Sequence, residues 1–518
     1  MTDPPSWLDA ALPWMLGAAM LAAAALAIWC SLSRMMALDE LYTMTLVEAP
    51  SLGHMIEGAL QGVDGNPPLY LSLGWLLVHA LPVSPDSLLR CLNLGLLAAT
   101  AMMLTRIGRR VADMPSVLIA LALLCALDEM VIFALLEVRT YALYLCLLTA
   151  TIWATLAVVD RPSASRATAL ATIGLLAAMA HSFGGFYVAA TIVPAALFCL
   201  TGEDRRPAAV LGVAALPALA VTLVWIFSTL STQLAVATPY GWIPRPSLAT
   251  LIQALTGSIP LTLSLLLTLA WFAARGQLAP HLAAWRQTTA SPDRAIPSVI
   301  VVSFAALTVA GWLGSHIVTS FFVDRYFIPN LAAAALLLIY AVAAARRLAP
   351  PRLFAAASAL CILSGLAMVA AGSSSTASEM PCVTGEGRFL EDGIDADLPV
   401  VIESPHAWLP RNRYAPSRTA LYPLDWDVVL NHPHRAPNNA MDFHIMEILK
   451  HWAPGGSALA TDVLPTAAIL SSHPHFLLLD EASRSWFGEL RAATPLNATL
   501  LGRSPGCRLW RIDLDQRP

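Results

Sequence analysis

The sequence predicts a polytopic α-helical membrane protein, with about eleven transmembrane helices and one juxtamembrane helix, followed by a C-terminal soluble α/β domain. Three observations lead to this fold class. The chain has 518 residues, of which 57% are hydrophobic and 12% charged, about half the charge of an ordinary soluble domain. Apolar runs of about 20 residues, enough to cross roughly 30 Å of hydrocarbon, recur before residue 372. Residues 373–518 then hold 17 of the 34 acidic residues and 12 of the 30 basic ones, as expected of a part that meets water.

The apolar runs predict the transmembrane helices in chain order. The first run follows MTDPPSWLDA, which has two acids and no base, and it exceeds the apolar core of a signal peptide, so we expect an uncleaved span. Residues 67–82 are only 16 long and are bracketed by prolines, which suits a juxtamembrane helix that does not cross. The predicted spans are residues 11–33, 87–105, 115–134, 141–159, 167–180, 184–200, 208–229, 250–274, 297–317, 326–345 and 353–371.

Arginine placement predicts the orientation of these spans, because cytoplasmic loops retain Arg and Lys. Alternate loops hold thirteen and five arginines, and the richer set is assigned to the cytoplasm. If residues 67–82 do not cross, the N-terminus is cytoplasmic and the first loop, residues 34–86, is exported with the tail. If they cross, the first loop lies on the opposite face; Arg34 alone counts against the first choice. The predicted domains are a membrane domain over 1–372, a linker over 373–380 and an exported α/β domain over 381–518.

The tail shows the pattern of a small mixed domain. Short apolar runs in LPVVIES, TALYPL, FLLLD and CRLWRIDL predict strands, and residues 439–452 and 482–492 have helical spacing. Cys382 and Cys507 are the two cysteines outside the predicted spans, and an oxidising compartment would permit a disulfide between them; the sequence leaves this pairing open. Two HPH motifs, at 432–434 and 473–475, fit loop composition better than a metal site.

The charge balance excludes one class of function. The net charge is −4 and the isoelectric point is near 6.3, so the chain has no basic excess with which to bind nucleic acid.

Polar side chains at the predicted exported ends of the spans are the candidate site. Each has an ordinary explanation when taken alone: solvated interfacial acids, a proline turn, a snorkelling ion pair, a capped histidine. If residues 67–82 do not cross, these groups converge on one face, with nothing comparable on the other, and this convergence favours a functional cavity. The candidates are Asp39, Glu40, Asn66, Tyr70, Arg90, Glu137, Arg139, Tyr141, His181, Arg325 and Tyr326.

The order of four of these segments resembles the GT-C superfamily of integral-membrane glycosyltransferases, in particular bacterial relatives of protein O-mannosyltransferases and of lipid A aminoarabinose transferases. The segments are Asp39-Glu40, GNPPLY at 65–70, LEVRTYAL at 136–143 and RYFIP at 325–329. The family pattern has a second tyrosine where Leu71 stands, and a glutamine where Leu136 stands; neither departure removes a charged group.

This resemblance implies a function and a set of partners. The donor would be a polyprenyl-phosphate sugar, and the acceptor a cell-envelope glycan, lipid or protein on the exported face of a bacterial inner membrane. Asp39 and Glu40 are the predicted catalytic acids, with Asp39 as the base; one base suffices because phosphate is already an acidic leaving group. Arg139 and Arg325, with Arg90 behind them, are predicted to stabilise the phosphate charge. Glu40, Glu137 and His181 are compatible with a divalent cation but lack a diagnostic spacing, so a metal stays open.

Two other classes of function remain open from the sequence. A transporter or lipid flippase would also have an acid-lined cavity, but it would predict inverted repeats and polar groups near the bilayer midplane, and neither is evident. A non-catalytic scaffold for envelope assembly would leave the acid pair dispensable.

Overall fold

The computed structural model describes residues 35–128, 130–131, 137–231, 243–256, 292–317, 320–348, 382–383, 388–416, 418–424, 431, 437–481 and 486–514. These residues belong to two compact units. The first comprises Met1–Ser33, Asn66–Ser228 and Arg245–Ala371, and the second comprises Arg34–Gly65, Thr229–Pro244 and Gly372–Pro518. The predicted spans 11–33 and 353–371 lie outside the described residues, so the total of eleven stays a prediction.

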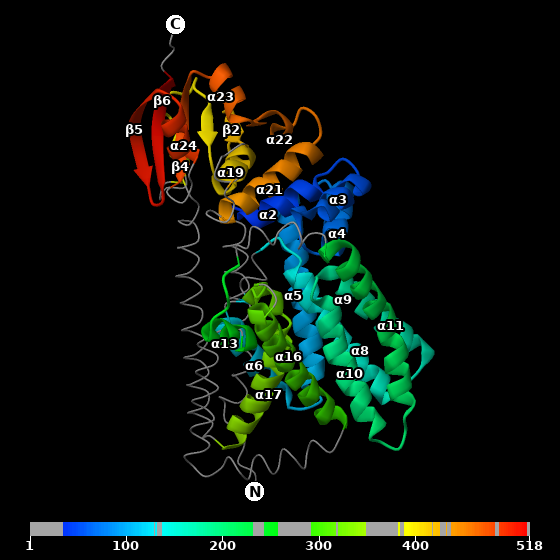
Figure 1. Cartoon of the computed structure of the whole chain (residues 1–518). Helices are drawn as coiled ribbons and strands as arrows, with labels where there is room; N and C mark the ends of the chain where they lie inside the picture. The colour runs from blue at the N-terminus through cyan, green and yellow to red at the C-terminus, as the bar shows by residue number, and fades with distance from the viewer. Residues whose placement is uncertain are drawn as a thin grey trace. The chain divides into compact units, whose positions relative to one another are not determined.

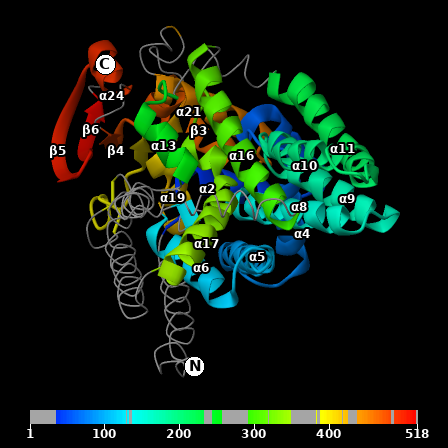
Figure 2. The same ribbon diagram turned by 90° about the horizontal axis from the view of Figure 1, so that it is seen from below.

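The first unit is built from apolar helices (Figures 1 and 2). Among the described residues, four helical stretches are long and apolar enough to cross a membrane: α5, α8, α11 with η2, and Ala295–Ile317 within α16. The bounds are α4 (Leu69–Ala80), α5 (Pro85–Gly108), α6 (Met114–Leu127), α8 (Tyr141–Asp160), α9 (Ala164–Ala180), α10 (Gly184–Leu200), α11 (Arg206–Trp225), η2 (Ile226–Leu230), α13 (Leu248–Thr256), α16 (Pro292–Ile317), η4 (Asp324–Phe327) and α17 (Asn330–Leu348).

Helix α8 lies at the centre of this unit, and α11 lies at its surface. Helix α8 packs against α5, α9 and α10, and most of its side chains are buried. Helix α11 packs on α9 and α10, and it exposes Val213, Leu216 and Val224. An exposed face of this composition is suited to hydrocarbon, which supports the expectation that these helices span a membrane.

Several helices differ in their bounds from the apolar runs that predict them, and three of these differences have a local cause. Helix α6 ends at Leu127 and not at 134, because Asp128 is not helical and its side chain accepts a hydrogen bond from the backbone N–H of Met130 at 2.8 Å. Helix α17 starts at Asn330, after Pro329 and the short 3-10 turn η4, and not at 326. Helix α4 has 12 residues, fewer than the 16 expected, since it begins only after Pro68.

The second unit contains a six-stranded mixed sheet with the strand order β3-β2-β1-β4-β6-β5. The first four strands in this order are parallel, whereas β6 is antiparallel to both β4 and β5. The predicted strands correspond to β1, β2, β4 and β6, and the two predicted helices to α21 and α24. The bounds are β1 (Val400–Ile402), α19 (Pro405–Tyr414), β2 (Ala420–Pro423), α21 (Pro437–Trp452), α22 (Ala458–Thr461), β3 (Val463–Leu464), α23 (Thr466–Ser472), β4 (His475–Glu481), α24 (Trp486–Ala493), β5 (Leu496–Ser504) and β6 (Cys507–Leu514).

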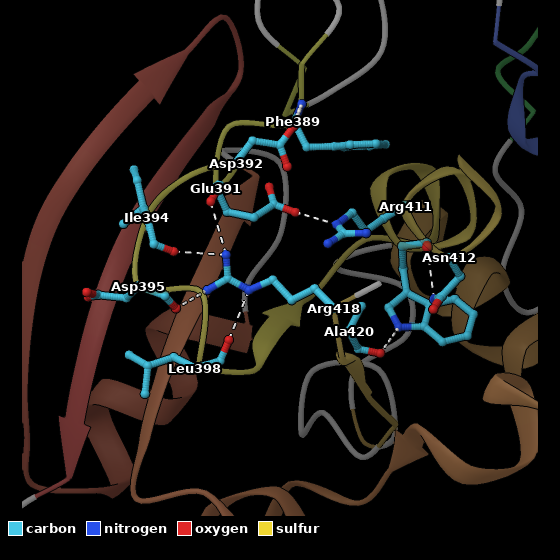
Figure 3. A network of polar contacts seen from close by, with 11 residues as sticks. Phe389, Glu391, Asp392, Ile394, Asp395, Leu398, Arg411, Asn412, Arg418 and Ala420 are labelled. Atoms are coloured by element: carbon cyan, nitrogen blue, oxygen red, sulfur yellow. Dashed lines mark hydrogen bonds and ion pairs between the residues drawn. The ribbon is translucent and has the colours of Figure 1, made fainter. Parts of the chain in front are cut away.

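Polar contacts and a disulfide hold the segment before β1 onto this sheet. Cys382 is bonded to Cys507, so the pairing that the sequence left open is present. The guanidinium of Arg418 donates four hydrogen bonds of 2.6 to 3.0 Å to backbone carbonyls between residues 391 and 398 (Figure 3). Beside it, Arg411 and Glu391 form a buried ion pair with an N–O distance of 2.6 Å. Burial raises the pKa of the Glu391 carboxyl even though this arginine opposes the shift.

The second unit also contains three short helices from the N-terminal part of the chain. They are α2 (Leu38–Val47), α3 (Leu52–Gly58) and the π-helical turn η1 (Ala59–Val63). Helix α2 packs against α19, while α3 and η1 pack against α21. The residues that carry the candidate base therefore belong to the same compact unit as the C-terminal sheet.

Candidate functional site

In the first unit, the corner before α8 is fixed by its neighbours. Thr140 donates a hydrogen bond from its hydroxyl to the carbonyl of Ala180, at 2.5 Å. This contact joins the EVRTY segment to the end of α9. Arg139 and Tyr141 are buried, and Glu137 is partly buried. Of the charged pair predicted from the sequence, Arg139 is therefore buried in protein, and Glu137 is partly accessible.

The PPLY helix is connected to the same corner through one amide. The hydroxyl of Tyr70, in α4, donates to Oδ1 of Asn93 at 3.0 Å, and Nδ2 of Asn93 donates to the carbonyl of Glu137 at 2.6 Å. Asn93 lies in α5, three residues after the buried Arg90. These two hydrogen bonds connect α4 to the corner before α8, and the substrate-binding role of Tyr70 stays a prediction. Asn66 lies near the next corner, accepting a long hydrogen bond of 3.5 Å from the backbone N–H of Ser182.

His181 lies in the short connection between α9 and α10, outside both helices. Its Nδ1 accepts a hydrogen bond from the backbone N–H of Phe183 at 3.1 Å, so in the neutral ring the proton is on Nε2. Nε2 is buried and has no hydrogen-bond partner among the described residues. Burial, followed by the positive charges of Arg139 and Arg325, lowers the pKa of His181 to about 3. The imidazole is therefore a neutral donor beside two guanidinium groups.

Aromatic rings surround this histidine. Tyr144 stacks on the imidazole with ring centroids 4.5 Å apart, Tyr326 meets it edge-on at 5.3 Å, and Tyr141 lies at 6.0 Å. The hydroxyl of Tyr144 is also buried without a hydrogen-bond partner among the described residues. Tyr326 of the RYFIP segment and Tyr141 of the EVRTY corner therefore both lie beside His181.

Two residues of this arrangement were missed by the sequence reasoning. Asn93 was counted as part of an apolar span, although a lone amide in such a run is itself a signal because burying it requires hydrogen-bond partners. Tyr144 was also counted as part of a span, although it follows Tyr141 by three residues and so shares its helix face. The sequence could not show what Asn93 and Tyr144 contact, because these contacts join segments that are distant in sequence.

In the second unit, the acid pair lies at the start of α2. Glu40 is fully buried, and its carboxylate accepts a hydrogen bond from the backbone N–H of Ala37, the N-cap residue, at 2.8 Å; this is the glutamate half of a capping box, since alanine has no side-chain acceptor for the other half. Asp39 is partly exposed. Of the two predicted catalytic acids, Glu40 is used to cap its own helix, and Asp39 is the one with accessible surface.

Metal ligation finds no support in the described part of the chain. There, no three His, Cys, Asp or Glu side chains are grouped so that they could hold an ion. What the first unit offers is two guanidiniums, one neutral N–H donor and tyrosine rings. Such a set suits a phosphate-bearing ligand with a polar, ring-shaped head group.

Comparison with known proteins identifies the fold. No protein-family model matches the sequence, and no curated protein matches it. The apo crystal structure of ArnT from Cupriavidus metallidurans superposes with a TM-score of 0.57 at 11% identity, covering 97% of this chain and 98% of that one. ArnT bound to undecaprenyl phosphate gives a TM-score of 0.56 with the same identity and coverage. The oligosaccharyltransferase AglB from Archaeoglobus fulgidus gives only 0.44, too low a score to support a shared fold.

The likeness to ArnT extends over nearly the whole of both chains, so it includes the helical unit and the C-terminal sheet together. The chain has the fold of ArnT, a membrane glycosyltransferase of the GT-C superfamily.

Proposed function

We propose that this chain is a GT-C glycosyltransferase that moves a sugar from a polyprenyl-phosphate donor to a cell-envelope acceptor on the exported face of the membrane. The acceptor would be a glycan, a lipid or a protein. The N-terminus would be cytoplasmic, and the C-terminal unit would be exported. The ArnT fold and the bound undecaprenyl phosphate of that relative support a lipid-phosphate donor.

The observation that carries this proposal is the set of groups around His181. The positive charges of Arg139 and Arg325 both lower the pKa of the imidazole. Its Nε2–H is buried and has no hydrogen-bond partner among the described residues. A buried donor left without an acceptor costs about 1 to 3 kcal/mol, so this position favours a ligand that supplies one. The phosphate of the donor does so, and two guanidiniums would balance its charge.

The chemistry would be a single displacement with inversion at the anomeric carbon. The acceptor oxygen attacks C1 of the sugar while the bond from C1 to the phosphate oxygen breaks, and the polyprenyl phosphate leaves. The proton of the acceptor hydroxyl passes to a carboxylate base. Negative charge grows on the leaving phosphate, where fixed cationic donors stabilise it without reorganising. No second acid is needed, because the leaving group is already a weak base.

Asp39 is the proposed base. It is the partly exposed member of its pair, whereas the carboxylate of Glu40 is buried and accepts a hydrogen bond from the backbone N–H of Ala37 at the start of α2. The remaining predicted residues would line the donor site: Asn66, Tyr70, Arg90, Glu137, Tyr141 and Tyr326.

The test compares strains that carry the wild type, Asp39→Asn or Arg139→Ala at equal membrane levels. Loss of a general base costs roughly 100- to 10,000-fold in rate, and loss of a charge-stabilising donor costs roughly 100- to 1,000-fold. Mass spectrometry of envelope glycolipids and polyprenyl-phosphate sugars should therefore show one glycan that lacks a single sugar in both variants, together with an accumulated lipid-linked donor.

Glu57→Gln and Arg110→Ala are the matched controls. Glu57 is an exposed acid of the same N-terminal segment, and Arg110 pairs with Asp160 in the first unit. Both controls should keep the wild-type glycan pattern. If Asp39→Asn and Arg139→Ala also leave every glycan mass unchanged, the transferase is rejected and a transporter or scaffold takes its place.

A further inference from the structure

The acid-bearing helix α2 is packed on the C-terminal part of the chain. Residues Arg34–Gly65 belong to the same compact unit as Gly372–Pro518. In Figure 1 the blue helices α2 and α3 lie beside the yellow and orange helices α19 and α21, and these pairs are in contact. Helix α2 has ten residues and α3 has seven. Isolated helices shorter than about 12 residues are marginal in water, so both need this packing to persist.

Two consecutive residues at the end of α19 hold α2 at both of its ends. The backbone N–H of Met36, just before α2, donates to the hydroxyl oxygen of Tyr414 at 3.0 Å. At the other end, Arg413 donates to both carboxylate oxygens of Glu48 at 3.1 and 3.3 Å. Helix α2 is about 15 Å long, so these contacts fix its direction as well as its position.

A second contact holds the helices that follow α2. The indole Nε1–H of Trp452, at the end of α21, donates to the carbonyl of His54 at 2.8 Å, and the two rings stack with centroids 4.5 Å apart. The approach is close, because a Cβ on Gly58 would lie 2.8 Å from Nε1 of Trp452 and 2.7 Å from Cδ2 of Leu46. Glycine at this position, the last of α3, therefore allows α2, α3 and α21 to approach closely.

Helix α19 is itself anchored in the sheet, so it can serve as a fixed support. The indole of Trp408 donates to the carbonyl of Ala420 at 2.8 Å. The buried ion pair between Arg411 and Glu391 holds the other side of α19, as Figure 3 shows. Arg413 and Tyr414 follow Arg411 by two and three residues. The residues that contact α2 therefore lie next to the residue that fixes α19 to the segment before β1.

We propose that the C-terminal domain is a clamp that positions the acid of α2 for sugar transfer, with Arg413, Tyr414 and Trp452 as positioning residues. This inference rests on the proposed function and on Asp39 as its base. Asp39 is the second residue of α2, three residues after the contact with Tyr414. A displacement of about 1 Å in a reacting group can cost 100-fold in rate, so loss of the clamp lowers turnover while donor binding persists.

The decisive experiment exchanges the charges of one clamp contact in the full-length protein. Arg413→Glu and Glu48→Arg each place like charges opposite one another, whereas the double variant restores an ion pair. We expect each single variant to lower kcat for transfer at least tenfold, with the KM for the lipid-linked donor changed less than twofold. The double variant should recover kcat to within about threefold of wild type. Tyr414→Phe, which deletes one oxygen and keeps the ring, should lower kcat to a smaller extent.

Arg511→Glu is the control, because Arg511 also forms an ion pair in the same unit, with Asp395; its side chain is 43% exposed, against 23% for Arg413. This variant should keep wild-type kcat. Single variants with wild-type kcat, or a double variant no better than either single one, would overturn the clamp.

Hydrogen exchange at the amides of residues 38–47 provides a readout that does not depend on transfer. Exchange should be at least tenfold faster in Arg413→Glu and should return to the wild-type rate in the double variant. Unchanged exchange would contradict the clamp even where transfer is lost. A wild-type protein that transfers no sugar but shows this exchange pattern would contradict the proposed function instead, so the two failures are distinguishable.

Discussion

The proton of one imidazole determines what the candidate site can bind. Because Nδ1 of His181 accepts from the backbone N–H of Phe183, the ring offers an N–H and not a lone pair at Nε2. A protonated imidazole would add a third positive charge beside Arg139 and Arg325. The low pKa of His181 excludes this at ordinary pH. The ring is therefore a directional donor, and the net charge of the site is set by the two arginines and the neighbouring acids.

This depressed pKa predicts a pH dependence of stability. Between pH 6.5 and about 3 the unfolded chain binds a proton at His181 and the folded chain does not, so stability falls as the pH falls below 6.5. The loss at pH 5 is on the order of 2 kcal/mol. His181→Asn, which keeps an acceptor for Phe183 but cannot titrate, should lose less stability between pH 8 and pH 5 than wild type does. Thermal unfolding in detergent at both pH values measures this, and equal pH dependence in the two proteins would contradict it.

At the residue scale, the sequence predicted chemical types better than partners. It named His181, Arg139 and Arg325 because polar side chains group at the predicted exported ends of the spans, and because two of these segments resemble GT-C motifs. It could not show that Asn93 connects Tyr70 to the Glu137 carbonyl, since those three residues lie on segments far apart in the chain. It named Asp39 as the base, but it gave no sign that Glu40 accepts a hydrogen bond from the backbone N–H of Ala37, because that contact is seen only in the structure.

At the scale of single elements, the apolar period and length predicted where most helices lie. Residues 184–200 were predicted as a span and form α10 with those bounds. The errors occur where a local polar contact ends a helix within an apolar run, as Asp128 does at the end of α6, or where a proline delays its start, as Pro329 does before α17. A hydropathy window averages over about 19 residues and therefore misses a boundary set by one side chain.

The corner between α9 and α10 predicts a second measurable effect. A Cβ added at Gly184 would lie 2.0 Å from the carbonyl oxygen of Ala177, and that oxygen belongs to the backbone of α9. Gly184→Ala must therefore push the two helices apart beside His181, at a cost of about 1 to 3 kcal/mol. Thermal unfolding in detergent should show a lower Tm, and transfer activity should fall with it.

Gly212 supplies the matched control for that substitution. It lies inside α11, and a Cβ there would meet nothing within 4 Å. Gly212→Ala should be neutral or should stabilise the protein by up to about 1 kcal/mol, because alanine is the better helix former. If the two alanine variants had the same Tm, the close approach at Gly184 would not be a constraint.

At the scale of the whole molecule, composition separated a membrane part from a water-exposed tail, but it did not indicate that residues 34–65 pack with that tail. The clamp contacts join residues that are 365 to 398 positions apart. No periodicity or motif spacing has that range, and a ten-residue helix carries too little apolar surface to reveal its partner. Disulfide pairing was likewise open in the sequence, because two cysteines suggest a bond only when the fold brings them together.

The disulfide bond between Cys382 and Cys507 predicts an effect on the stability of the C-terminal unit and the side of the membrane on which that unit lies. It closes a loop with a sequence separation of 125 residues, which is worth about 4 to 5 kcal/mol in the chain-entropy model. Replacing both cysteines by serine should therefore lower the unfolding midpoint of the C-terminal unit. In cells, rapid alkylation of free thiols should leave this pair unmodified if the unit is exported, because structural disulfides persist in oxidising compartments. Full alkylation of both thiols would place the unit in the cytoplasm.

The clamp contacts also have a consequence for biosynthesis. Met36 leaves the ribosome 378 residues before Tyr414, its partner. At synthesis rates of about 5 to 20 residues per second, this interval lasts roughly 20 to 80 s. Throughout that time the segment that carries Asp39 has been synthesised, but its partner Tyr414 has not. A nascent or truncated chain could insert its helices and still not transfer sugar, so activity would begin only when the last quarter of the polypeptide has folded. Under the proposed function, sugar transfer would therefore begin only after synthesis of the chain is complete.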